Sequence, residues 1–147
     1  MRAALFDTSI YISALRQPSD TALYLRRLQS GVFLWLSSVV LAELYAGADQ
    51  RAHPVLERLQ HDFEAARRIL VPNLTDCTWA GRMLACLGRE HGFESIGRSR
   101  MTNDALIAAS ASRLGILVIT SNDRDFRLLS AWCPLQWTTL ADLERSG

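Results

Sequence analysis

Residues 3–9 read AALFDTS, and this stretch sets the pattern for the whole chain. The apolar run at 3–6 predicts a short buried strand, Asp7 follows it directly, and Thr8 or Ser9 can cap a following helix. Similar pairs of strand and helix recur further along the chain. Right-handed crossovers between such pairs produce a central, mainly parallel β-sheet flanked by helices. We therefore expect an α/β protein whose functional crevice lies beyond the carboxyl ends of the strands.

Apolar periodicity, capping residues and glycines predict the other elements. Further strands are expected at 32–36, 116–120 and, as an edge strand, 135–137. Helices are expected at 19–31, 39–47, 55–70, 75–87, 103–114 and 127–130. A basic loop at 97–100 and an acidic turn at 121–126 are expected between them.

The chain has 147 residues, of which 49% are apolar and 21% charged, and its net charge is +1. These values are typical of a globular protein with a single domain over residues 1–147. The longest apolar run, 32–42, is too short for a membrane helix, and the N-terminus lacks the apolar core of a secretory signal. The 3 cysteines have neither a CxxC nor a Cys/His spacing, which disfavours disulfides and zinc. We therefore expect a cytoplasmic protein.

All 16 basic side chains are arginine, because the sequence contains no lysine. The planar guanidinium group binds phosphate and carboxylate groups in a bidentate manner, which favours RNA or another acidic partner. A genome rich in G and C favours arginine codons and explains the same count. The arginine content alone therefore leaves nucleic-acid binding open.

Two acids occupy positions where a carboxylate needs an explanation. Asp7 follows the first strand, which aims it into the expected crevice, although it can also cap the next helix. Glu43 is the only charged residue between Gly31 and Asp49, and it shares a helix face with apolar residues. A carboxylate there costs free energy unless a cation pairs with it. An exposed helix end or an arginine partner explains Glu43 equally well.

More acids are expected at the same edge of the sheet. Asp104 is expected in the first turn of a helix whose alanines allow a close approach to the sheet. Asn122, Asp123 and Asp125 follow the last buried strand, although turns are commonly rich in such residues. Acids from all these positions would repel one another unless a cation lay between them.

The ligand types indicate which cation this would be. Oxygen ligands without histidine or cysteine favour Mg²⁺, with Mn²⁺ as a possible substitute. His53, His61 and His91 lie at unrelated positions and are interpreted as surface residues. Without a recognisable serine or cysteine nucleophile, the expected chemistry is metal-assisted hydrolysis, in which the metal lowers the pKa of bound water and neutralises a phosphodiester.

Four segments occur in a familiar order: LFDTSI at 5–10, SSVVLAEL at 37–44 with Gly47, NDALIAASA at 103–111, and VITSN through DF at 118–126. Together they resemble the PIN domain superfamily and, within it, the VapC-type ribonuclease toxins of bacterial type II toxin–antitoxin pairs. The resemblance covers nearly the whole chain. It implies a three-layer PIN-like fold and a metal-dependent endoribonuclease that is usually a homodimer and is inhibited by a cognate antitoxin.

The resemblance also assigns catalytic and metal-binding positions to a set of side chains. The set comprises Asp7, Glu43, Asp104, Asn122, Asp123 and Asp125. Many family members carry an acid where this chain has Asn122, so the choice among the last three residues stays open. Ser9 stands where an asparagine is frequent. Thr8 and Thr120 are expected to hydrogen-bond the carboxylates and orient them.

Partners follow from the same expectations. Arg98, Arg100 and Arg124 are expected to contact RNA phosphates near the metal, and solvated surface charge is the alternative. The helices between residues 21 and 70 are expected to clamp a segment of the antitoxin. The identity of the RNA is left open.

Two other functions compete with the nuclease. A PIN-like module that binds nucleic acid or protein without cutting is favoured by Asn122, and magnesium-dependent cleavage discriminates between the two. A phosphatase or a response-regulator-like receiver also gathers aspartates at strand ends. It requires a lysine after a late strand, which this sequence lacks.

Overall fold

The structure is a computed structural model that describes residues 2–16, 31–94 and 98–146. In these ranges five strands form one sheet, in the order β3-β2-β1-β4-β5, and every pairing is parallel. The strands are β1 (Arg2–Phe6), β2 (Val32–Ser37), β3 (Ile69–Leu70), β4 (Leu117–Thr120) and β5 (Trp137–Thr139). The prediction of a mainly parallel sheet is confirmed.

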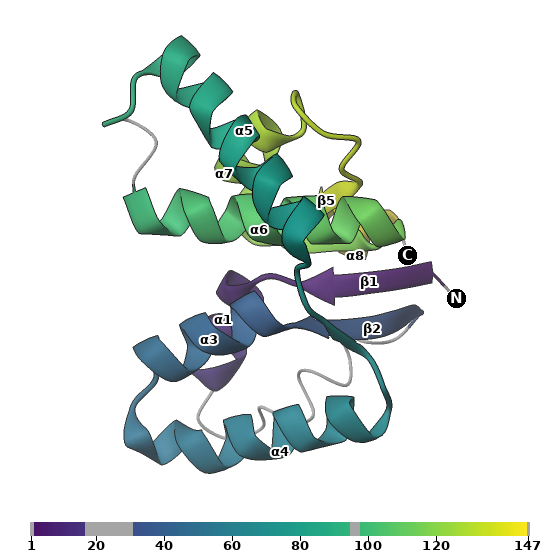
Figure 1. Cartoon of the computed structure of the whole chain (residues 1–147). Helices are drawn as coiled ribbons and strands as arrows, with labels where there is room; N and C mark the ends of the chain where they lie inside the picture. Colours follow the sequence, from purple (N-terminus) through teal and green to yellow (C-terminus); the bar gives the residue numbers. More distant parts are fainter. Residues whose placement is uncertain (1, 17–30, 95–97, 147) are drawn as a thin grey trace.

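Helices cover the sheet on both sides. Those in the described ranges are α1 (Thr8–Leu15), α3 (Ser38–Gly47), α4 (His53–Ala65), α5 (Leu74–His91), α6 (Arg98–Leu114), α7 (Asp123–Leu129) and α8 (Leu140–Ser146), with the short 3₁₀ helix η1 (Gln50–Ala52). Helices α3 and α4 pack against β2, whereas α6 packs against β4 and carries α5 on its outer side (Figure 1). This is the expected three-layer α/β architecture.

Strand β1 lies in the middle of the sheet because both of its faces are apolar. Leu5 pairs with Val118 of β4, and both side chains are fully buried. Phe6 packs edge to face on Tyr11 of α1, with ring centroids 5.8 Å apart. Asp7, the next residue, therefore starts from a fixed position at the carboxyl end of the sheet.

Helix α4 is shorter than the apolar spacing predicts. It ends at Ala65 rather than at Leu70. Arg67 adopts a left-handed conformation with φ of 57°, and the N–H groups of Arg67 and Arg68 bond back to carbonyls of the last helical turn, both at 3.0 Å. This is a Schellman motif, which usually contains glycine at the left-handed position. Because no glycine marks this stop, neither the end of α4 nor strand β3 could be predicted from the sequence.

Two helices begin earlier than predicted. Helix α6 begins at Arg98, so the expected basic loop is partly helical and Asp104 lies in the second turn instead of the first. Helix α7 begins at Asp123 because the side chain of Asn122 caps it, accepting a hydrogen bond from the N–H of Arg124 at 3.4 Å. The expected acidic turn is therefore largely the first turn of a helix.

The remaining differences are small. Helix α5 begins one residue before the expected cap at Thr75, and Asn73 forms a capping box with Asp76. Strand β5 lies slightly later than the predicted edge strand, and α8 and η1 were not predicted. The helix predicted at 19–31 falls almost entirely outside the described residues. None of the described helices has the length and apolar character to span a membrane.

Candidate functional site: an acidic cluster at the strand ends

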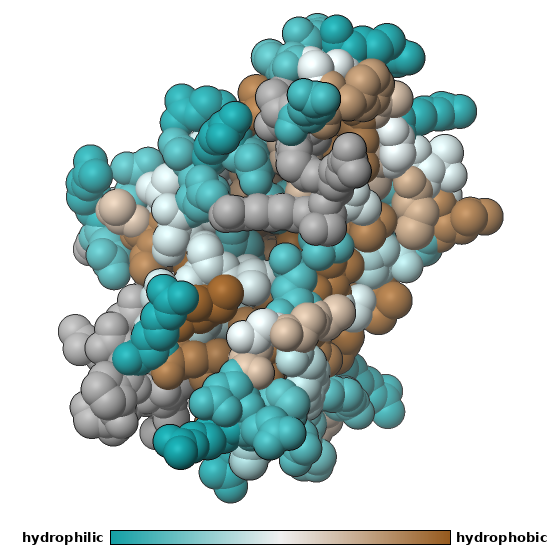
Figure 2. All heavy atoms as spheres, turned by 90° about the vertical axis from the view of Figure 1, so that its left-hand side faces the viewer, coloured by the Kyte–Doolittle hydropathy of each residue, from teal (hydrophilic) through white to brown (hydrophobic). Residues whose placement is uncertain are grey.

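Four acidic side chains come together where β1, β2 and β4 end. Asp7 follows β1, Glu43 lies on α3 after β2, Asp104 lies on α6, and Asp125 lies on α7 after β4. The negative charges of the other three all act on Asp104. We call these four residues the acidic cluster. Figure 2 views the molecule from the side toward which β1 points in Figure 1, and on it hydrophilic surface borders exposed hydrophobic side chains.

Asp7 is the most firmly held member of the cluster. Its Oδ1 accepts a hydrogen bond from Ser9 Oγ and its Oδ2 one from Thr120 Oγ1, both at 2.5 Å. The two hydroxyls in turn accept the backbone N–H groups of Ser121 at 3.1 Å and Asn122 at 3.0 Å. Burial raises the pKa of Asp7, and the bonds from Ser9 and Thr120 oppose the rise. The carboxylate is thus fixed to both β1 and the turn after β4.

Glu43 is held by one hydrogen bond from the opposite side of the crevice. Thr8 Oγ1 donates to its Oε1 at 2.8 Å, which joins α1 to α3. Helix α3 is itself fixed at its start, where Ser37 Oγ accepts the N–H of Val39 at 3.2 Å. The side chain is partly buried. Glu43 therefore faces the same crevice as Asp7.

Asp104 has the most perturbed pKa of the cluster. Its side chain is buried, and burial is the largest of the causes that raise its pKa to about 9. A hydrogen bond with the Asp125 carboxyl raises it further, as do the negative charges of Asp125, Asp7 and Glu43. At neutral pH and without a cation, Asp104 therefore keeps a proton and shares it with Asp125.

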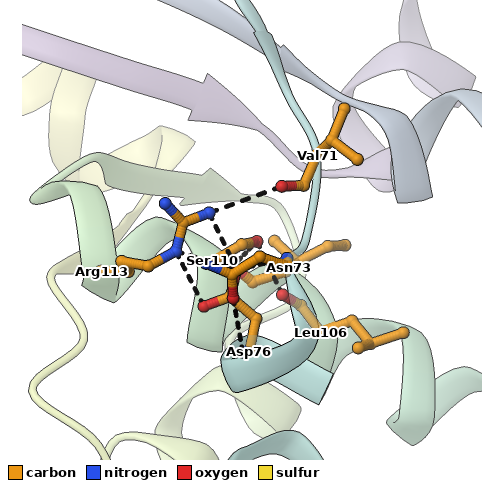
Figure 3. Close-up of polar contacts among 7 residues, drawn as sticks. Val71, Asn73, Asp76, Leu106, Ser110 and Arg113 are labelled. Carbon is orange, nitrogen blue, oxygen red and sulfur yellow. Dashed lines mark hydrogen bonds and ion pairs between the residues drawn. The ribbon is translucent and has the colours of Figure 1, made fainter.

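A third buried acid provides the contrast. Asp76 at the start of α5 is 2% exposed, but Arg113 of α6 pairs with it through Nε at 3.0 Å and Nη2 at 2.9 Å (Figure 3). The same carboxylate also accepts the N–H of Asn73 at 2.9 Å. Asp76 thus has its own cation. No arginine or histidine side chain that the structure describes forms an ion pair with Asp7 or Asp104.

The other candidates after β4 lie outside the cluster. The side chain of Asn122 caps α7, and the carboxylate of Asp123 forms an ion pair with Arg127 at 2.5 Å. Asp123 does not contribute to the raised pKa of Asp104, whereas Asp125 does. The geometry therefore favours Asp125 as the fourth acid.

The expected RNA-binding arginines are only partly described. Arg124 is exposed on α7, next in sequence to Asp125. Arg98 and Arg100 lie in the first turn of α6, and their side chains are outside the described part of the structure. Of these three arginines, only Arg124 has a side chain that the structure describes, and it lies beside the acidic cluster.

A pocket of about 620 Å³ opens beside the acidic cluster, with Asp125 in its wall. It lies between the end of α5, the first half of α6 and helix α7. Leu87 and Met101 form part of it, and both are buried. Arg124 and Arg127 contribute positive charge. The cluster is thus continuous with a cavity of the size that holds small ligands.

The side chains of the cluster offer the type of ligand atom that a hard divalent cation prefers. All four side chains offer carboxylate oxygens, which Mg²⁺ and Mn²⁺ prefer. Within the described residues, no three His, Cys, Asp or Glu side chains already form a metal-binding arrangement. Asp104 and Asp125 instead share a proton, and a cation of higher charge can take the place of that proton.

One contributor was missed by sequence reasoning. Ser9, which the family resemblance marked only as a departure, bonds Asp7 and the backbone of Ser121. Its position two residues after an acid, at the start of a helix, was the available signal. Thr8 bonds Glu43 and Thr120 bonds Asp7, so both threonines hydrogen-bond carboxylates of the cluster as expected, although the sequence did not indicate which threonine meets which acid.

An all-parallel α/β sheet with acids gathered at its strand ends defines a recognisable class of domain. The chain matches the PIN domain family over residues 4–131, a span that includes the whole acidic cluster. The chain therefore belongs to the PIN domain family.

Solved structures place the chain more narrowly. VapBC-5 from Mycobacterium tuberculosis, a member of the VapBC family of toxin–antitoxin systems, is 27% identical with a TM-score of 0.55, and 95% of this chain and 99% of that chain are covered. VapBC-1 from nontypeable Haemophilus influenzae is 25% identical with a TM-score of 0.60, covering 94% and 98%.

DNA-bound VapBC from Salmonella typhimurium is 20% identical with a TM-score of 0.63, covering 95% and 99%, and supports the fold. No curated protein sequence matches the chain at a significant level. The resemblance to VapC-type PIN domains is confirmed, and at the level of the family it supports a toxin nuclease.

Proposed function

We propose that the chain is a magnesium-dependent endoribonuclease and the toxin of a toxin–antitoxin pair that acts in the cytoplasm. Its family and its structural neighbours support a nuclease of this kind. One observation carries the metal-dependent part: four carboxylates share a site in which the pKa of Asp104 rises to about 9. Burial is the largest cause of this rise, and the bond and negative charges of the neighbouring carboxylates add to it. A partly buried group of acids of this kind favours a cation among them.

Asp7, Glu43, Asp104 and Asp125 would hold the ion. When bound, Mg²⁺, or Mn²⁺ in its place, neutralises charge on a phosphodiester and makes water easier to deprotonate. Asp125 takes the fourth position in this proposal, because Asn122 caps α7 and Asp123 pairs with Arg127.

The residues around the cluster prepare it for this chemistry. Ser9 and Thr120 hold both oxygens of Asp7, and Thr8 holds one oxygen of Glu43. Carboxylates fixed in this way reorganise little when the reaction begins, which lowers the cost of reaching the transition state. The proton that Asp104 holds, in its hydrogen bond with Asp125, would leave if a cation bound.

RNA is the proposed substrate, and arginines would position it. Arg124 is exposed beside Asp125, and Arg98 and Arg100 lie at the start of α6. Contacts from arginine to the phosphates fix the register of a nucleic-acid strand but do not read its sequence. The cut site would therefore be chosen by contacts other than these.

An antitoxin is the first proposed partner. A pocket of about 340 Å³ lies between α1 and α3 and has Glu43 in its wall. Its other walls include the apolar side chains of Ile12, Leu15 and Leu44. An antitoxin segment that filled this pocket would cover part of the acidic cluster, which accounts for inhibition by steric exclusion.

A second copy of the chain is the other proposed partner. Leu74 is 83% exposed at the start of α5, and Val71 and Trp79 nearby are also exposed. Exposed apolar side chains that gather in one region mark a protein interface. We assign this surface to a homodimer.

The test of the proposed function is cleavage of a mixed RNA pool by purified, antitoxin-free protein with Mg²⁺, with Mn²⁺ and with a chelator. Asp7→Asn is the variant of the cluster, and Asp62→Asn on the exposed face of α4 is its matched control. We expect metal-dependent cutting that Asp7→Asn abolishes and Asp62→Asn retains. Folded protein that cuts no RNA with either metal would overturn the proposal in favour of a binding module.

A further inference from the structure

The 620 Å³ pocket beside the cluster is not explained by metal binding. Its lining combines apolar with charged side chains: Leu87, Met101 and Leu128 are apolar, Arg124 and Arg127 are basic, and Asp123 and Asp125 are acidic. A nucleotide has the same two-sided character, because its flat base is largely apolar on its faces and its phosphate is an anion.

Arg127 is held in place before any ligand arrives. Its Nη2 pairs with Asp123 at 2.5 Å, and its guanidinium carbon lies 5.7 Å from the centroid of the Trp137 ring. This leaves other N–H groups of the fork for a phosphate. Asp123 therefore has a role as the anchor of Arg127. Arg124 forms no ion pair with any side chain in the described ranges.

The position of the pocket relates it to the cluster. Asp125 lines the pocket and also hydrogen-bonds Asp104. Asp125 is therefore shared by the pocket and the cluster, so a nucleotide in the pocket would lie next to a phosphodiester at the cluster. His91, half exposed, lies at the pocket and offers an aromatic face for a base.

We propose that this pocket holds one nucleotide of the RNA next to the bond that is cut, with its base on Leu87 and Leu128 and its phosphate toward Arg124 and Arg127. This inference rests on the proposed function, because it names the part of the substrate that the same site selects. The pocket then determines which base precedes or follows the cut, whereas the acidic cluster is indifferent to sequence.

The first test measures binding without cleavage. The full chain, free of metal in the presence of a chelator, is titrated with each of the four nucleoside 5′-monophosphates, with ribose 5-phosphate and with inorganic phosphate, and followed by amide chemical shifts. We expect at least one nucleotide to bind at least tenfold more tightly than inorganic phosphate, with shifts at 87–91 and 123–128. Equal binding of nucleotides and phosphate, or shifts elsewhere, would overturn the inference.

Two pairs of variants sharpen this test. Leu128→Trp fills the pocket, and Leu114→Trp makes the same change at an exposed position of α6 outside it. Arg124→Glu reverses a charge at the pocket, and Arg82→Glu does so on the exposed face of α5. We expect the first member of each pair to weaken nucleotide binding at least tenfold and the second to leave it unchanged. Equal effects within both pairs would contradict the pocket.

The second test uses cleavage and separates this inference from the proposed function. Leu128→Trp should raise KM and relax the base preference at the cut site, with a smaller effect on kcat. If the chain cuts RNA and this preference is unchanged in Leu128→Trp and in Arg124→Glu, the inference fails and the nuclease stands. If nucleotides bind in the pocket but no RNA is cut, the inference about the pocket is supported and the proposed nuclease function is contradicted.

Discussion

At the residue scale, the proposed nuclease activity depends on how firmly the carboxylates of the acidic cluster are held. Thr120 contributes one hydroxyl that donates to Asp7 and accepts the N–H of Asn122, and it is fully buried. A side chain of the same shape without the hydroxyl would leave Oδ2 of the buried Asp7 without this hydrogen-bond donor. The threonine is therefore a positioning residue for Asp7.

Replacement of Thr120 tests this role. We expect Thr120→Val to weaken activation by Mg²⁺ by about 10- to 100-fold, because residues that orient metal ligands usually contribute this much. Thr120→Ser keeps the hydroxyl and should restore most of the activity. The measurement is the cleavage rate as a function of Mg²⁺ concentration. A Thr120→Val protein with unchanged metal dependence would show that the hydrogen bond does not position Asp7.

Asp104 links the cluster to the stability of the metal-free protein. Its pKa is about 9 in the folded state and near the ordinary value of 3.8 in the unfolded chain. The folded state therefore binds this proton more tightly between these values, so the contribution of Asp104 to the free energy of unfolding is largest below about pH 4 and is lost as the pH rises toward about 9. Asp104→Asn cannot ionise and should lose this contribution to the pH dependence.

Urea unfolding of the chelator-treated protein at pH 5, 7 and 9 measures this difference. We expect the wild type to lose more stability than Asp104→Asn as the pH rises, and Mg²⁺ to stabilise the wild type more than the variant at pH 8. Parallel pH profiles for the two proteins would mean that Asp104 does not hold a proton in the folded state.

The residue scale also shows what the sequence could not decide. Asp7, Glu43 and Asp104 could be singled out as candidates because a carboxylate at a strand end or on an apolar helix face is unusual. Asp123 and Asp125 were indistinguishable in a segment expected to be a turn. On a helix, residues two apart point to nearly opposite sides, so α7 directs Asp125 to the cluster and Asp123 to Arg127.

At the scale of elements, helix α6 both carries Asp104 and packs closely against the sheet. Ala105, Ala108 and Ala111 are fully buried, which lets the helix approach the sheet as their small size predicts. Its other end is fixed to α5 by the ion pair of Arg113 with the buried Asp76 (Figure 3). Asp104 therefore sits on a helix that is anchored at a distance from the cluster.

The ion pair between α5 and α6 provides a stability prediction. Arg113→Ala leaves Asp76 buried without its cation, which should cost about 3 kcal/mol of unfolding free energy. Arg82→Ala, on the exposed face of α5, should cost little. Urea denaturation measures both. A loss below about 0.5 kcal/mol for Arg113→Ala would show that Asp76 reaches water or another partner.

Element boundaries were the weakest part of the sequence prediction, for physical reasons. Strands β1, β2 and β4 and helix α3 were correctly placed because apolar runs and capping serines mark them. The end of α4 was missed because an arginine, Arg67, occupies the left-handed position that glycine usually signals. The start of α6 was missed because Thr102 looks like a cap but lies inside the helix.

At the scale of the whole molecule, two surfaces would serve different partners. The pocket between α1 and α3 lies at the acidic cluster, whereas the exposed apolar residues at the start of α5 lie apart from it. In our proposal, an antitoxin at the first surface would block the site, and a second copy at the other would leave it open. Assembly and inhibition are therefore expected to be separable by mutation.

A charge at the start of α5 should break the homodimer. Leu74→Glu places a carboxylate at the side chain that is 83% exposed, where it is harmless in the monomer and costly in an apolar interface. We expect sedimentation velocity to report dimers for the wild type and monomers for the variant. Exposed Glu57→Gln on α4 is the control. A wild type that is monomeric at all concentrations would contradict the assignment of this surface.

The proposed function depends above all on the acidic cluster being a metal centre. Direct binding of Mn²⁺, followed by electron paramagnetic resonance of the free ion, tests it on wild type, Asp7→Asn, Asp125→Asn and the Asp62→Asn control. We expect tight binding by the wild type and the control, and at least tenfold weaker binding by both cluster variants. Equal binding by all four proteins would contradict it.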